Sequence, residues 1–465
     1  MRRFILHYAH LCQLAGGVDA FCIGTEMVAL TQIRGPGNSF PAVAAFRQLA
    51  AEVKAILGPG CKIGYAADWS EYWGYAPGNG ERFFHLDPLW ADENIDFIGI
   101  DNYLPLSDWR DGEEHADAGW GSIYALDYLR ANIEGGEYYD WYYAAPEHRA
   151  AQIRTPISDG AHGEPWIWRA KDLRNWWLND HHERVGGVRS EVATAWVPQS
   201  KPIWFTEMGC AAVDKGTNQP NKFLDPKSSE SGLPHHSDGR RDELIQMQYL
   251  RAMTSYWGEA ARNPVSAVYG GPMLDMSRAH VWAWDARPWP QFPLNTALWS
   301  DGENYARGHW ISGRAVAQPL ASVVAEICGA AGITEIDVSG LYGLVRGYTM
   351  TGDQTGRAGL QSLMLAYGVE ARERDGKLVY RMRDGRVDAD LAAADLALGE
   401  GEAVVETVRA AEAEIVGRVR LAYVEAEGDF EVKAVEAVFP DAAAGAATGS
   451  ELPLALTRAQ AQGIV

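Results

Sequence analysis

Two short stretches, Ala20-Phe-Cys-Ile-Gly-Thr-Glu26 and Pro202-Ile-Trp-Phe-Thr-Glu-Met-Gly209, decide the fold of this chain. Each contains an apolar run that ends in a threonine followed by a glutamate. Short apolar runs bounded by polar residues are typical of buried strands. A glutamate directly after such a strand lies at its carboxyl end, which is where a βα barrel builds its active site.

Three further runs end in polar residues in the same way: Lys62-Ile-Gly-Tyr-Ala-Ala-Asp68, Asp96-Phe-Ile-Gly-Ile-Asp101 and His280-Val-Trp-Ala-Trp-Asp285. Helical patterns lie between several of the runs, at 42–57 and 240–257. Nearly continuous apolar strands that alternate with helices predict a parallel sheet covered on both faces. A flavodoxin-like open sheet would give similar periodicity, but it would not explain carboxylates at the ends of two well-separated strands. We therefore predict an α/β fold of the (β/α)₈ TIM-barrel class.

The two glutamates suit one particular chemistry. Retaining hydrolysis of a glycosidic bond needs a carboxylic acid that protonates the leaving oxygen and a carboxylate that attacks the anomeric carbon, about 5–5.5 Å apart. Strand ends around a small barrel mouth can aim Glu26 and Glu207 at one such centre. Their mutual repulsion would separate their pKa values, so that one is protonated near neutral pH and the other ionised.

Gly24-Thr-Glu26 and the 202–209 block resemble the acid/base and nucleophile strands of clan A glycoside hydrolases, most closely the β-mannanase-like members. Those are the fourth and seventh strands of the barrel. The first 307 residues also resemble the TIM-barrel-like domain of the baseplate hub proteins of gene transfer agents, which are phage-like particles. The tail, including Val323-Val-Ala-Glu-Ile-Cys328 and Leu341-Tyr-Gly-Leu-Val-Arg-Gly347, resembles the phage tail hub domain that follows that barrel.

The resemblance implies roles for individual residues. Glu26 matches the acid/base and Glu207 the nucleophile, while Tyr103 matches a tyrosine that hydrogen-bonds the nucleophile and Trp284 the aromatic floor under the reacting sugar. Thr25 stands where many clan A members have an asparagine that contacts the sugar 2-hydroxyl. From their place at strand ends, we expect Asp101, Asn102 and Trp69 to line the groove, although Trp69 with Asp68 could equally belong to a turn or helix cap. We expect Trp282 to pack in the interior.

The resemblance also sets the expected organisation. If Glu26 follows the fourth strand, strands 4–8 are present and strands 1–3 are not, so the chain is expected to be part of a longer polypeptide whose N-terminal half completes the barrel. Residues 1–307 are the predicted barrel part, with a long insertion at about 104–200 that contains a helical run over 166–184. Residues 308–465 are the predicted smaller, β-rich α+β hub domain, which is expected to be incomplete, with strands at 377–382 and 418–423 and a linker or exposed helix at 388–414.

Composition excludes several functions. A net charge of −21 without clustered Lys and Arg argues against nucleic acid as the main ligand, and no apolar run is long enough for a membrane span. The five scattered cysteines predict neither disulfides nor a zinc site, and the proposed chemistry needs no metal or organic cofactor. The pairs His181-His182 and His235-His236 are not predicted to form metal sites, because adjacent side chains point apart. They are predicted to be surface residues, the first pair near a helix C-terminus and the second in a polar loop.

Two functions follow. The first is a retaining hydrolase of a cell-envelope or surface glycan, made in the cytoplasm and carried in the tail baseplate of a particle released from the cell. The second is a non-catalytic baseplate or sugar-binding module built on a degenerate hydrolase. In either case the resemblance implies other tail proteins as partners, and by analogy with a trimeric tail hub it suggests assembly as a homotrimer.

Overall fold

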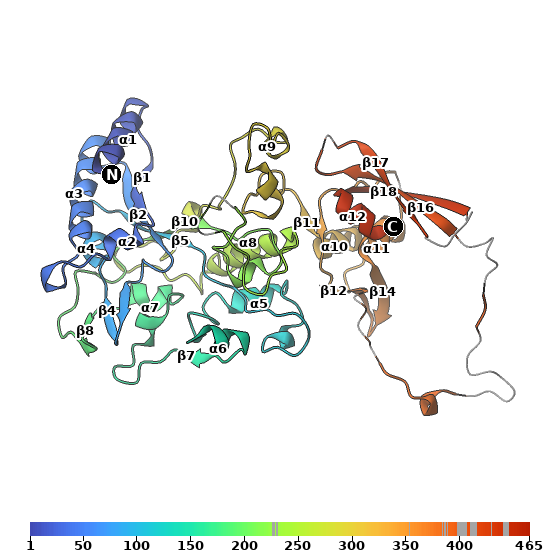
Figure 1. Cartoon of the computed structure of the whole chain (residues 1–465), viewed down its shortest axis with the longest axis horizontal. Helices are drawn as coiled ribbons and strands as arrows, with labels where there is room; N and C mark the ends of the chain where they lie inside the picture. Colours follow the sequence, from blue (N-terminus) through green and yellow to red (C-terminus); the bar gives the residue numbers. More distant parts are fainter. Residues whose placement is uncertain are drawn as a thin grey trace. The chain divides into compact units, whose positions relative to one another are not determined.

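The structure is a computed structural model that describes residues 1–225, 228, 231–352, 354–383, 385, 387, 389–397, 407–409, 416–428, 430–439 and 446–465. The chain divides into two compact units (Figure 1). The first comprises residues 1–286 and 303–311, and the second comprises 287–302 and 312–465. The predicted boundary near residue 307 remains a prediction.

The first unit is built on a four-stranded parallel sheet in the order β1-β2-β5-β10. Its strands are β1 (Ala20–Thr25), β2 (Lys62–Asp68), β5 (Phe97–Asn102) and β10 (Ile203–Met208). They coincide with four of the five apolar runs, which confirms the predicted parallel sheet. Burial of apolar side chains stabilises these strands: Ile63, Ile98 and Phe205 have no exposed surface.

The fifth apolar run, at 280–285, does not form the expected strand. It makes one isolated parallel bridge to β10, between Val281 and Met208. Beyond that point the backbone of Ala283 bonds instead to the segment near residue 310: its N–H donates to the His309 carbonyl and its carbonyl accepts from the N–H of Ile311. The chain therefore leaves the sheet at Trp282.

Helices cover the sheet as predicted. Helix α3 (Pro41–Leu57) begins at a proline, which suits the first helical position, and ends at Gly58 with a left-handed φ of 85°. Helix α8 (Glu243–Trp257) is capped by the side chain of Asp242, which accepts from the N–H of Ile245. Both helices contribute buried side chains to the core that contains the strands.

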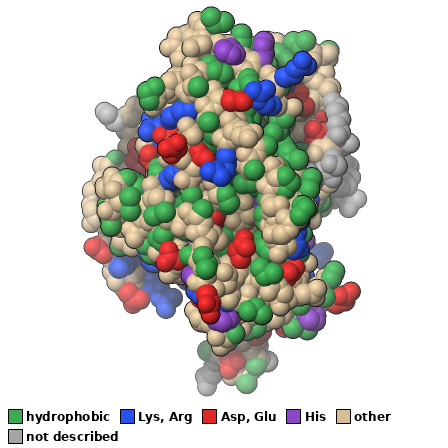
Figure 2. Space-filling model, turned by 90° about the vertical axis from the view of Figure 1, so that its left-hand side faces the viewer, with side chains coloured by type: hydrophobic (Ala, Val, Ile, Leu, Met, Phe, Trp, Pro, Cys, Tyr) green, Lys and Arg blue, Asp and Glu red, His purple; other side chains and the backbone are tan. Residues whose placement is uncertain are grey.

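Helix α1 (Arg2–Leu14) packs on α3 through one face. Ile5, Leu6 and Ala9 lie against the core, whereas Phe4 and Leu14 on other faces are exposed. Figure 2 shows this side of the molecule, where hydrophobic side chains lie among charged ones. The remaining short elements before β5 are β3 (Tyr75–Gly78), β4 (Glu81–Phe83), α2 (Val28–Thr31), α4 (Asp87–Trp90) and the 3-10 helix η1 (Pro36–Asn38).

The long insertion after β5 consists of short elements joined by turns. They are η2 (Ala118–Trp120), α5 (Leu126–Ala131), β6 (Trp141–Tyr142), α6 (Pro146–Ala150), β7 (Thr155–Pro156), η3 (Pro165–Trp168), α7 (Leu173–Leu178), β8 (Arg184–Val185) and β9 (Val188–Arg189). Buried hydrogen bonds attach the start of the insertion to η4 (Gly216–Asn218), in the loop after β10: the Ser107 hydroxyl donates to Asn218 Oδ1 at 2.6 Å, and the Leu106 N–H donates to the Thr217 carbonyl at 2.9 Å.

Two predictions within the insertion are wrong. The helical run over 166–184 is only η3 followed by α7, because Asp172 caps a new helix by accepting from the Asn175 N–H. His181 is not a surface residue but is fully buried. Its Nδ1 lies 2.8 Å from Asp87 Oδ2 and its Nε2 lies 2.7 Å from the Trp176 carbonyl, so both ring nitrogens have partners.

The second unit is a separate β-rich domain with its own core. Its sheets have the orders β12-β15-β14, β17-β16-β18 and β11-β13. The strands are β11 (Gln318–Pro319), β12 (Ile336–Gly340), β13 (Leu344–Val345), β14 (Val369–Arg374), β15 (Lys377–Met382), β16 (Val416–Glu425), β17 (Val432–Val438) and β18 (Ala446–Leu456). The helices are α9 (Gln291–Leu294), α10 (Leu320–Ala330), α11 (Gly356–Tyr367) and α12 (Arg458–Ile464).

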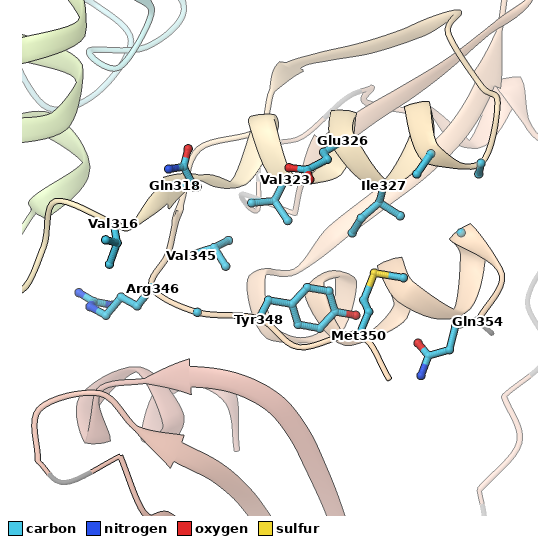
Figure 3. Close-up of a pocket in the computed structure, with 14 residues that line it drawn as sticks. Val316, Gln318, Val323, Glu326, Ile327, Val345, Arg346, Tyr348, Met350 and Gln354 are labelled. Atoms are coloured by element: carbon cyan, nitrogen blue, oxygen red, sulfur yellow. The ribbon is translucent and has the colours of Figure 1, made fainter. Parts of the chain in front are cut away.

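The two period-two segments of this unit form the predicted strands, β15 and part of β16. The linker or helix predicted at 388–414 lies largely outside the described residues; the described part includes one 3-10 turn, η7 (Ala393–Asp395). A pocket of about 510 Å³ lies between α10 and the segment after β13 (Figure 3). Val323 and Ile327 of α10 lie on one side of this pocket, and Tyr348 and Met350 lie on the other.

Candidate active site

Acidic side chains gather at the carboxyl ends of the parallel strands. Glu26 directly follows β1, Asp68 ends β2, Asp101 is the fifth residue of β5, and Glu207 lies near the end of β10. The strand register places Asp101 beside Asp68 on one side and beside Glu207 on the other. The sheet therefore brings together residues that are far apart in the sequence, as predicted from the two Thr–Glu pairs.

Asp101 joins the two outer strands of this sheet. Thr25 Oγ1 of β1 donates to Asp101 Oδ2 at 3.0 Å, and Thr206 Oγ1 of β10 donates to Asp101 Oδ1 at 2.7 Å. The Asp101 side chain is fully buried. Each threonine immediately precedes one of the two candidate catalytic glutamates.

Small residues allow Thr25 to reach across the neighbouring strand. Its partner in β2 is Ala66, whose own partner in β5 is Gly99. A Cβ on Gly99 would lie 2.6 Å from the Tyr65 carbonyl oxygen, so only glycine fits there. The ladder is irregular beside both Thr–Glu pairs, between Cys22 and Thr25 and between Phe205 and Glu207. Such irregularities commonly redirect side chains near active sites.

Glu207 is held by Tyr103. The phenol hydroxyl donates to Glu207 Oε2 at 2.6 Å, a length typical of a hydrogen bond to an ionised acceptor. Tyr103 is 8% exposed. Its ring is nearly perpendicular to the ring of His309, and the two ring centroids are 5.7 Å apart. Burial raises the pKa of Glu207, and the Tyr103 hydrogen bond acts in the opposite direction. The contact has the form that the resemblance implied.

Glu26 has a different environment. Its backbone is left-handed, with φ 48°, and its N–H donates to the Ala66 carbonyl at 2.8 Å. Partial withdrawal of the carboxyl from water, together with the charges of Asp101, Asp68 and Glu207, raises the pKa of Glu26 to about 8. No ion pair involves Glu26 among the residues that the structure describes.

Two further members of the site, Glu71 and Tyr65, did not emerge from the sequence. Glu71, fully buried, accepts hydrogen bonds from the hydroxyls of Thr31 and Tyr65, and Tyr65 in turn accepts from the Met27 N–H. Burial raises the pKa of Glu71 to about 7. Burial and the charge of Glu207 together raise the pKa of Asp101 to about 7. The spacing Asp68-Trp-Ser-Glu71 was the one available signal for Glu71, because it places a second carboxylate just past the end of β2.

The aromatic and polar residues that were expected near the groove differ in their exposure and in their contacts. Trp69, at the end of β2, is half-buried and packs on Tyr138 of the insertion, with ring centroids 5.6 Å apart. Asn102 is 4% exposed, and its Oδ1 accepts from the Leu104 N–H at 3.4 Å. Trp284 is 65% exposed and no ring contact involves it among the described residues. Trp282 is not buried as expected but 50% exposed, because the chain turns away from the sheet there.

No group of three or more His, Cys, Asp or Glu side chains within the described ranges has an arrangement that could hold a metal ion. None of the helices in the described part of the chain is both long enough and apolar enough to cross a membrane. The five cysteines are free.

Residues 1–293 match the family described as the GTA TIM-barrel-like domain, and residues 355–465 match the family described as putative phage tail protein. No curated protein matches the chain.

Among solved structures, a chain from the "Virion of native gene transfer agent (GTA) particle" is 95% identical over 36% of this chain and 38% of that chain, with a TM-score of 0.35. Two structures of a GH113 beta-1,4-mannanase, one of them a complex, are 15% and 14% identical, with TM-scores of 0.25 and 0.29. The matches to these two cover 59% and 67% of this chain and 50% and 57% of those chains. The chain thus spans less than two thirds of the length of each of these three solved chains.

Proposed function

The chain belongs to the family of GTA TIM-barrel-like domains, and from that premise we propose that it is a retaining glycoside hydrolase carried in the tail of a gene transfer agent particle. The proposed substrate is a β-linked glycan of the recipient's envelope or surface. The match of residues 355–465 to a phage tail family and the identity to a chain of the GTA virion support the location in the particle. Other tail proteins are the proposed partners.

The observation that carries the enzymatic proposal is the convergence of two Thr–Glu strand ends on one buried aspartate. This arrangement brings Glu26 and Glu207 close enough for the charge of Glu207 to act on Glu26. Two carboxyl groups in different electrostatic environments are what retaining hydrolysis requires.

The environments assign the two roles. Glu26 faces several carboxylates and keeps its proton near neutral pH, so it is the proposed general acid that protonates the leaving oxygen. Glu207 accepts the Tyr103 hydrogen bond, which stabilises its ionised form, so it is the proposed nucleophile. Attack by Glu207 on the anomeric carbon would form a glycosyl-enzyme and break the bond to the leaving group, which receives the proton of Glu26. Glu26, now ionised, would then take a proton from water as that water releases the sugar from Glu207.

The surroundings of Glu26 also bear on the non-catalytic alternative. Beside Glu26, the carboxyl groups of Asp101 and Glu71 are fully buried, and neither has an ion pair among the described residues. Buried carboxyl groups without an ion-pair partner cost stability, and such sites are commonly functional.

The test is a screen of the full chain against peptidoglycan and β-mannan, with Glu207→Gln and Glu26→Gln as variants. We expect the first variant to lose at least about 10³-fold in cleavage rate, because the nucleophile is removed while the shape is kept. Glu93→Gln, at an exposed glutamate in the loop before β5, is the matched control and should cleave at the wild-type rate. Wild-type turnover by Glu207→Gln would exclude the mechanism, and no cleavage by the wild type would favour the non-catalytic module.

A further inference from the structure

We infer that Asp101 is a positioning residue for the proposed hydrolysis: it ties the two Thr–Glu strand ends together and thereby fixes where Glu26 and Glu207 stand relative to one another. This inference rests on the proposed function. It gives Asp101 a role different from the substrate contact expected from its place on the strand.

The burial of Asp101 argues against contact with a glycan. Its side chain has no exposed surface, and each of its two oxygens already accepts a hydrogen bond from a threonine. Because no part of the side chain reaches the surface, a sugar hydroxyl has no open path to either oxygen. Any effect of Asp101 on catalysis must therefore pass through the residues that it holds.

The two threonines provide that connection. Thr25 and Thr206 belong to the first and last strands of the sheet order, and β2 and β5 lie between them. Because each threonine is bonded to Asp101 and is joined by one peptide bond to a glutamate, the aspartate couples the positions of the two glutamates. Misplacement of a reacting group by about 1 Å can cost about 10²-fold in rate.

Asp101 also acts through its charge. Titratable groups from all four strands of the sheet face Asp101. They are Cys22 in β1, Glu26 directly after β1, Tyr65 and Asp68 in β2, Tyr103 directly after β5, and Glu207 in β10. Among the charges that raise the pKa of Glu26, that of Asp101 has the largest effect. Loss of this charge would make Glu26 give up its proton at lower pH.

The experiment compares kcat, KM and the pH profile of the full-length wild type with those of Asp101→Asn, Thr25→Val and Thr206→Val, on the glycan that the wild type cleaves. Thr25→Ser and Thr206→Ser keep the donor hydroxyls. Asp96→Asn is the matched control, because Asp96 lies just before the amino end of the same strand and bonds Lys54. Circular dichroism checks that each variant is folded.

We expect Asp101→Asn to lower kcat about 10- to 100-fold, to change KM little, and to move the alkaline limb of the pH profile down by about one unit. The valine variants should lower kcat and the serine variants should restore it, which keeps the test decisive if Asp101→Asn does not fold. Asp96→Asn should leave the pH profile unchanged. If Asp101→Asn keeps the wild-type kcat and an unshifted alkaline limb, or if Asp96→Asn shifts that limb equally, the inference is overturned and the proposed function is not. If the wild type cleaves no glycan, both the proposed function and the inference are overturned.

Discussion

Tyr103 donates its phenol hydrogen to Glu207 across neighbouring strand ends, at 2.6 Å, although the two residues are 104 positions apart in the sequence. The bond favours the ionised carboxylate and fixes its direction. It also distinguishes Glu207 from Glu26, which lies among carboxylates.

The first prediction concerns this bond. Tyr103→Phe should lower kcat/KM about 10-fold. A hydrogen bond to a charged group contributes about 1.5–3 kcal/mol, but this bond also stabilises the ground state, so only part of that free energy lowers the activation barrier. Because the bond lowers the pKa of Glu207, its loss raises that pKa, so the acidic limb of the pH profile should move to higher pH. Tyr72→Phe is the control: it removes an equally buried hydroxyl, bonded to the Ala170 carbonyl, and should leave the limb in place.

The second prediction concerns Glu26 as the acid. Activity on a natural glycan should fall as pH rises through about 8, because the protonated carboxyl is needed to assist the leaving group. Glu26→Gln should abolish this cleavage, yet the same variant should still form the glycosyl-enzyme from an aryl glycoside whose leaving group needs no proton. A burst of aryl alcohol measures that step. Equal loss on both substrates would contradict the assignment.

The third prediction follows from proton linkage. The pKa values of Glu26, Glu71 and Asp101 are raised in the folded chain to about 8, 7 and 7. At these three carboxyls the folded state binds more protons than the unfolded state, so their contribution to the free energy of unfolding should decrease as pH rises between about pH 4.5 and 8. The buried His85 and His309, whose pKa values are lowered to about 3 and 4, act in the opposite direction, so the contribution has to be isolated by comparing variants. Urea unfolding of the wild type and of Glu71→Gln at pH 5 and pH 8 does this: the change in the free energy of unfolding from pH 5 to pH 8 should be less unfavourable in Glu71→Gln than in the wild type, and a more unfavourable change in the variant would contradict the prediction.

The fourth prediction concerns the close approach of strands. Gly99→Ala should lower the free energy of unfolding by about 1–3 kcal/mol, because the added Cβ would meet the Tyr65 carbonyl at 2.6 Å and the Ala66 Cα at 3.0 Å. Gly119→Ala, where a Cβ meets nothing within 4 Å, should change it by less than about 0.5 kcal/mol. Denaturant unfolding of both variants gives the comparison, and equal effects would show that the packing at Gly99 is looser than described.

The fifth prediction concerns the aromatic pair. Trp69→Ala and Tyr138→Ala should each raise KM a few-fold with a smaller effect on kcat, since aromatic contacts contribute about 0.5–1.5 kcal/mol and a sugar face would rest on this surface. Trp120→Ala, in the same insertion, removes an exposed tryptophan elsewhere and is the control. Unchanged KM in both variants would exclude a substrate contact at Trp69.

The strands and the position of Glu26 and Glu207 at strand ends could be predicted because their signals are local. Strands β1, β2, β5 and β10 are each formed by a nearly continuous apolar run. The end of such a run therefore predicts, without any other information, which residue lies at the edge of the sheet. The role of Asp101 could not be predicted, because its donors lie 76 and 105 residues away. His181 was misplaced for the same reason: a partner 94 residues away makes its burial favourable.

The predicted strand at 280–285 fails differently. Its alternation of tryptophan with small residues fits a strand, but the backbone of Ala283 is already bonded to the segment near His309. Competition between two hydrogen-bonding partners is decided by tertiary structure, which periodicity does not reveal.

The insertion is built into the first unit at several places. Ser107 bonds Asn218 of η4, and His181 bonds Asp87. Leu129, Trp176 and Trp177 of the insertion lie in the same core as the strands. Exchange of the whole insertion would therefore open part of that core to water, so evolutionary variation is easiest in its exposed turns.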